Sequence, residues 1–134
     1  MNVLTQISTI IGGHLMLRVK DNSTERLARR ILEDLESIGM PTDFTLDLRG
    51  YSKIYEGRYD SAKKLMILYV REHDGSFLPY EDIIRVAIHE GVHHIQWQHD
   101  PNFVRIKGVM HNKEFKRLLE IYTQRYKELE ELIC

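Results

Sequence analysis

The chain has 134 residues, of which 43% are hydrophobic and 29% charged; this excludes a disordered protein and fits one globular domain over residues 1–134. Its formal net charge of −1 gives no overall attraction to nucleic acid, so no nucleic-acid partner is indicated. Cys134 is the only cysteine, which excludes an intrachain disulfide and a zinc site built from cysteines, and fits a reducing compartment.

Residues 1–19 are fairly apolar but resemble neither a signal peptide nor a membrane span. The segment has no basic start, Gly12 and Gly13 interrupt its apolar run, and the chain has no run of about 18 apolar residues. We therefore expect a cytoplasmic protein that contacts no membrane. Apolar residues at helical spacing predict a short N-terminal helix over residues 3–11, and alternation predicts a strand over 15–19.

A second helix is predicted from Asn22 to Ile38. Asn22 is a favourable cap, apolar residues recur at helical spacing after it, and Gly39 and Pro41 end the pattern. Acidic and basic residues alternate on its polar side. This mixture is typical of a solvated face rather than of a nucleic-acid surface.

Three stretches predict strands, over residues 44–48, 55–59 and 65–70. The segment Asp60-Ser61-Ala62-Lys63 predicts a hairpin turn between the last two strands. A helix, a small antiparallel sheet and then further helices indicate a domain of the α+β class.

A helix that begins near Tyr80 and ends before Asp100-Pro101 carries the main chemical signal of the chain. Its apolar residues form a stripe that we expect to be buried. Gly91 lies in this stripe and lowers the helix propensity, so we expect another stretch of backbone to pass close to it.

This helix contains the sequence His89-Glu90-Gly91-Val92-His93. Histidines four residues apart lie one turn from each other on the same face, so both imidazoles can reach a single metal ion. Glu90 projects from the adjacent strip and can act on a metal-bound water without being a ligand. This is the H-E-x-x-H arrangement of zinc-dependent hydrolases.

A catalytic zinc site takes three protein ligands, and the third ligand has three candidates. His99 completes a spacing that resembles the metzincin peptidases, but a helix that continues past His93 points His99 away from the metal. His111 directly precedes the last helix, which Asn112 can cap, and is the ligand that we favour. Glu114, in the first turn of that helix, is the carboxylate alternative.

The remaining histidines are not expected to be metal ligands. His94 is rotated by about 100° from its neighbour in the motif and is expected to be exposed or packed. His14 and His73 have no partner at ligand spacing, and His73 is expected to be a surface residue.

The motif, a loop of moderate length and His111 with Phe115 four residues later resemble the SprT-like (Spartan-type) metallopeptidases. Small gluzincin-like peptidases share the order of helix, sheet, motif helix and ligand helix. The resemblance covers the last half of the chain by motif and most of it by element order. Asn112 stands where glycine usually follows the third histidine in that family. The resemblance implies a zincin-like domain.

We therefore expect a zinc-dependent metallopeptidase that hydrolyses peptide bonds in a polypeptide substrate. Zn²⁺ held by His89, His93 and His111 lowers the pKa of its bound water, and Glu90 acts as the general base.

Tyr69, Tyr80 and Tyr122 are candidate donors to the oxyanion. By analogy with the zincin fold, the strand over 65–70 is expected to run along the cleft and to bind an extended peptide by strand addition, and the alternative is a buried strand of the sheet.

Two other function classes stay open. A zinc-stabilised, catalytically inactive protein-binding module would use the same site only to hold its fold together. The other class is a metal-dependent hydrolase of another substrate. Peptide deformylases carry H-E-x-x-H but take an upstream cysteine ligand that this chain lacks, and small three-histidine ribonucleases lack the glutamate at position 90.

Overall fold

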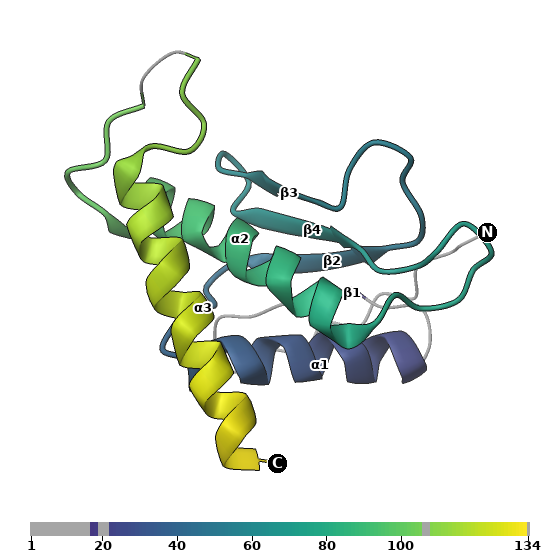
Figure 1. The fold of residues 1–134 in the computed structure, drawn as a ribbon. Coiled ribbons are helices and arrows are strands. Elements are labelled where there is room, and N and C mark those ends of the chain that lie inside the picture. The colour runs from purple at the N-terminus through teal and green to yellow at the C-terminus, as the bar shows by residue number, and fades with distance from the viewer. Residues whose placement is uncertain (1–16, 19–21, 106–107, 134) are drawn as a thin grey trace.

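The computed structural model describes residues 17–18, 22–105 and 108–133. The elements are β1 (Leu17–Arg18), α1 (Asn22–Ser37), β2 (Thr45–Arg49), β3 (Gly57–Asp60), β4 (Leu65–Tyr69), α2 (Tyr80–His99) and α3 (Lys113–Ile133). The fold is α+β, which confirms the predicted class (Figure 1). The helix expected over residues 3–11 lies outside the described residues, as does most of the strand expected over 15–19.

Within the described part of the chain, the strands form a single sheet in the order β1-β2-β4-β3. β3 and β4 are antiparallel and joined by the expected hairpin turn, in which the Asp60 carboxylate accepts a hydrogen bond from the Lys63 N–H. β2, however, runs parallel to both β1 and β4. The predicted antiparallel sheet is therefore wrong, because the sheet is mixed.

The composition of β4 explains this strand order. Its three middle residues, Met66, Ile67 and Leu68, are all buried, so the strand is apolar on both faces. Such a strand is most stable in a central position of the sheet, where it has a neighbouring strand on each side. The short turn places β3 on one side, so β2 pairs with the other, and residues 50–56 carry the chain from β2 past β4 to β3.

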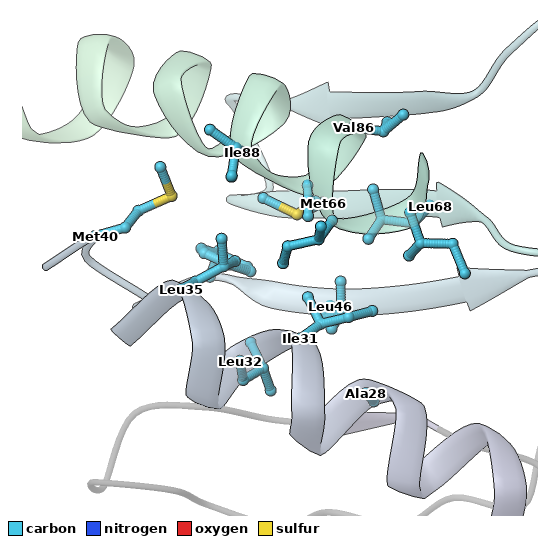
Figure 2. Close-up of a cluster of buried hydrophobic side chains, with 14 of the residues drawn as sticks. Ala28, Ile31, Leu32, Leu35, Met40, Leu46, Met66, Leu68, Val86 and Ile88 are labelled. Carbon is cyan, nitrogen blue, oxygen red and sulfur yellow. The ribbon is translucent and has the colours of Figure 1, made fainter. Parts of the chain in front are cut away.

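Helices α1 and α2 cover the same face of this sheet. Leu46 pairs with Met66, and Leu48 with Leu68, so these four side chains share one face by strand alternation. They belong to one core cluster with residues of both helices. Figure 2 labels the central members, which are Ala28, Ile31, Leu32, Leu35, Met40, Leu46, Met66, Leu68, Val86 and Ile88.

Helix α2 has more buried residues than any other element of the described chain, and α3 begins beside its C-terminal half (Figure 1). Its buried residues are not confined to the predicted apolar stripe, because Glu90, His94 and Gln96 are also buried. No helix among the described residues combines the length and the apolar character that a membrane crossing requires.

Gly91 is needed for a reason other than the expected one. A Cβ at this position would overlap the Sδ atom of Met40, so a buried side chain rather than a passing backbone occupies the space. Met40 is itself only 3% exposed and is enclosed by the core. Glycine therefore allows α2 to lie against the segment that follows α1.

Replacing Gly91 by alanine is expected to lower the free energy of unfolding by about 1–2 kcal/mol. Because the added Cβ overlaps an enclosed Met40 side chain, we expect overpacking to cost about 2–3 kcal/mol, the upper part of its usual range, and helix propensity to return about 1 kcal/mol. Urea unfolding measures the change, and Met40→Ala in the Gly91→Ala background serves as the control, because it vacates the space. A Gly91→Ala protein as stable as the wild type would contradict this packing.

Candidate metal centre

Helix α2 presents His89 and His93 side by side on one face. Both side chains are half-buried, and their ring centroids are 5.2 Å apart. This is the separation of one helical turn that the sequence spacing predicts.

His111 joins these two residues from the segment just before α3. Its ring centroid lies 4.9 Å from that of His89 and 5.2 Å from that of His93. One nitrogen from each of the three rings lies within 4.8 Å of the others. The structure thus brings together the three residues that the sequence indicated as metal ligands.

Asn112 fixes the backbone beside His111. Its Oδ1 accepts a hydrogen bond from the Phe115 N–H at 2.8 Å, which is the predicted cap of α3. The same Oδ1 accepts a second hydrogen bond, at 3.1 Å, from Nε2 of Gln96 on α2. Gln96 is 1% exposed and so ties the start of α3 to α2. No local pattern in the sequence indicates this partner of Gln96.

Phe115 forms an apolar floor under the three imidazoles. Its ring centroid lies 4.9 Å from that of His89 and 4.5 Å from those of His93 and His111, and it is 1% exposed. An apolar shell of this kind orients ligand rings and keeps water from their far side.

Replacing Phe115 by leucine is expected to weaken zinc binding by about 10-fold, because a branched side chain cannot hold three rings in one orientation. Stability should fall by about 1–2 kcal/mol from the lost volume. Competition with a chromophoric chelator measures the affinity. Phe103→Leu is the matched control, because Phe103 contacts Trp97 rather than the three histidines. Equal zinc affinity in the Phe115→Leu protein would show that the floor is not needed.

The two alternative third ligands are engaged elsewhere. Nε2 of His99 lies 2.8 Å from Oδ1 of Asp43. His99 therefore points away from His89 and His93, as the helical rotation predicted. Glu114 forms a two-point ion pair with Arg117 at 2.7 and 2.6 Å.

Glu90 lies on the wall of the same cleft as the three histidines. It is only 8% exposed, and this burial raises the pKa of its carboxyl to about 7. A carboxyl in such surroundings exchanges a proton near neutral pH.

The motif imidazoles are held in the neutral form. Burial, followed by repulsion from the neighbouring imidazoles, lowers the pKa of His93 to about 4. Burial and the nearby His111 and Arg85 likewise lower the pKa of His89. Neutral imidazole is the form that coordinates a metal ion.

The cleft at these residues has a volume of about 350 Å³. Its lining consists of Tyr55, Gly57, Arg58, Tyr59, Ser61, His89, Glu90, His93, Trp97, Arg105, Met110 and His111. Edge strand β3 contributes three of these, Gly57, Arg58 and Tyr59. Gly57 allows β3 to approach α2 closely, because a Cβ at this position would lie only 2.6 Å from Cγ1 of Val86.

Two expectations about this cleft are wrong. β4 is hydrogen-bonded to β2 on one side and to β3 on the other, so it has no free edge for a peptide. None of the three proposed oxyanion donors lines the cleft. Tyr80, for example, donates a hydrogen bond to Asp34 at 2.6 Å. The tyrosines at the cleft are Tyr55 and Tyr59, and strand order, which the sequence did not give, brings them there.

Comparisons with protein-family models, curated proteins and solved structures found no match. The resemblance to SprT-like metallopeptidases therefore stays a prediction. What bears on function is the geometry of the site: three imidazoles that converge, a buried carboxyl beside them, and a cleft with an edge strand along one side.

Proposed function

We propose that this protein is a zinc-dependent metallopeptidase with a zincin-like, SprT-like domain. The observation that carries the proposal is the convergence of His89, His93 and His111, whose ring nitrogens lie within 4.8 Å of one another. Two of these residues come from α2 and the third from a segment far along the chain, so tertiary folding is required to bring them together.

The residues present fit a catalytic zinc site. Three imidazoles with a fourth position left for water form a known donor set for such sites. All three histidines line the cleft, so an ion that they held would be reached from it. A zinc ion bound there supplies a Lewis acid that lowers the pKa of a water molecule and polarises a peptide carbonyl.

Glu90 supplies the proton transfer that peptide hydrolysis requires. Its carboxyl lies on the cleft wall beside the ligands. It accepts a proton from the attacking water and returns it to the leaving amine, acting first as base and then as acid. The burial of Glu90 also limits competition from bulk water for that proton.

The substrate is an extended polypeptide, held by edge strand β3. In the described sheet β3 has a strand neighbour on one side only, and its residues line the cleft. The backbone N–H and C=O groups of an unpaired edge accept an added strand. A peptide paired in this way would lie along the cleft that Glu90 and the three histidines also line.

Digestion of denatured casein tests the proposal. The zinc-loaded protein is expected to release fragments, a chelator to stop the release, and added zinc to restore it. A structured RNA incubated in parallel should stay intact. Absence of fragments from protein with a measured zinc content would contradict the peptidase assignment.

A second candidate is a metal-stabilised binding module without activity. The observation that favours it is the linkage between α2 and α3 through His111, Asn112 and Phe115, which a bound ion would reinforce. This function predicts zinc-dependent thermal stability in a protein that cleaves no polypeptide.

A further inference from the structure

A second convergence of metal-binding side chains lies on another face of α2. His94 and His99 both point toward Asp43, which belongs to the segment between α1 and β2. Nε2 of His94 lies 2.7 Å, and Nε2 of His99 2.8 Å, from the same Oδ1 of Asp43. One potential ligand atom from each residue lies within 4.8 Å of the other two.

We propose that Asp43, His94 and His99 form a second metal site, selective for a divalent transition ion such as zinc. Two imidazoles and a carboxylate are a common donor set for zinc and related ions. This inference does not rest on the proposed peptidase function, because none of the three residues lines the cleft.

The geometry requires only a small adjustment on binding. The two nitrogen–oxygen distances are those of hydrogen bonds, so without a metal the Asp43 carboxylate holds the two rings together. Ligands at about 2.0–2.1 Å around a tetrahedral ion lie about 3.3 Å apart, so each of the two nitrogen–oxygen distances would open by roughly half an ångström. The side chains of His99 and Asp43 are 37% and 34% exposed and can make this movement, whereas His94 is fully buried and fixed.

Tyr59 supplies the outer hydrogen bond that a metal-ligating histidine needs. Its hydroxyl oxygen lies 2.7 Å from Nδ1 of His94. When Nδ1–H donates to this oxygen, the lone pair of Nε2 faces the ion, and the ring is held in that tautomer. Without the ion, the Asp43 carboxylate can only accept a hydrogen bond, which favours the tautomer in which Nε2–H donates to Asp43 and the Tyr59 hydroxyl donates to Nδ1.

Lys64 does not block the site. Its Nζ lies 3.3 Å from the other carboxylate oxygen of Asp43, Oδ2, which leaves Oδ1 for the ion. The Lys64 side chain is 45% exposed, and an ion pair at such a position contributes little. The ammonium group balances part of the Asp43 charge, and its exposed side chain is free to adjust if an ion binds to Oδ1.

Binding at this second site would act on the cleft through Tyr59. Tyr59 lies on β3 and lines the cleft, while its hydroxyl contacts His94. An ion on Asp43, His94 and His99 thus fastens the end of α2 to the start of β2 and holds Tyr59 against α2. Its role is to position the edge strand rather than to take part in chemistry.

Zinc content per chain tests the second site. Protein freed of metal with a chelator is reloaded with Zn²⁺ and dialysed against a weak competitor. We expect about two zinc ions in the wild type and about one in each of the His99→Ala and His111→Ala proteins. The His99→Ala/His111→Ala double variant should retain none. His73→Ala, which removes an exposed histidine outside both clusters, should retain both ions.

The pattern of results separates the two sites. If His99→Ala has the same zinc content as the wild type, the proposal of a second site is overturned, whatever the result at the first site. The wild type could instead bind a single zinc ion that is lost in His99→Ala and kept in His111→Ala. That result would support the second site and count against the first. Asp43→Asn keeps the shape of the side chain but removes its charge, so it should lower the second affinity by at least 10-fold in a protein that still folds.

Discussion

Replacing Glu90 by glutamine is expected to leave zinc bound and to reduce casein hydrolysis by about 100- to 10,000-fold. Proton transfer by a positioned side chain contributes a factor of this size. Glutamine has the same shape but cannot accept a proton, and position 90 is not a ligand position. Burial opposes the charged carboxylate, so the neutral amide is tolerated and the fold should not be weakened.

The measurement combines initial rates of casein cleavage with zinc content and the urea unfolding midpoint of the same samples. Glu81→Gln is the matched control, because Glu81 lies in the first turn of α2, is exposed and does not line the cleft. It should retain the wild-type rate. Turnover that survives in the Glu90→Gln protein would show that Glu90 is not the base.

Replacing His111 by alanine is expected to weaken zinc binding at the first site by more than 100-fold, because one of three protein ligands is lost. Removing an outer-shell partner already costs about 10- to 100-fold. Hydrolysis should fall with the metal occupancy and recover only in part at high zinc concentration. His111 is exposed, so the substitution leaves no cavity in the core.

Zinc affinity is measured by competition with a chromophoric chelator, and activity is measured across a zinc titration. His73→Ala serves as the control, because the His73 ring contacts Tyr51 and belongs to neither histidine cluster. Wild-type affinity and activity in the His111→Ala protein would exclude His111 as a ligand. The assignment of the cleft as the metal centre would then fail.

Features that depend on neighbouring residues were predictable from the sequence. The bounds of α2 follow from its apolar periodicity and from Asp100-Pro101, and Asn112 caps α3 as expected. The turn before β4 also followed from its polar residues. In each case a local pattern determines the backbone, so a short stretch of sequence suffices.

Features that depend on residues far apart could not be predicted in this way. β2 pairs with β4 because β4 is apolar on both faces and takes a central position in the sheet. The alternation of residues within β2 gives no information about this partner. Asp43 and His94 are 51 positions apart, and no pattern near either residue indicates their hydrogen bond. Tyr59 reaches the cleft only because β3 is the edge strand.

Phe115 is the only fully buried residue of α3 among those described, although several apolar side chains of this helix pack partly against the core. α3 therefore buries less surface against the rest of the domain than α2, which has buried residues along most of its length. Elements joined to a domain in this way open as separate cooperative units at a lower free energy than global unfolding. A metal ion shared between α2 and His111 would raise that free energy, so proteolytic sensitivity and amide exchange in α3 would follow the metal content while the sheet stays protected.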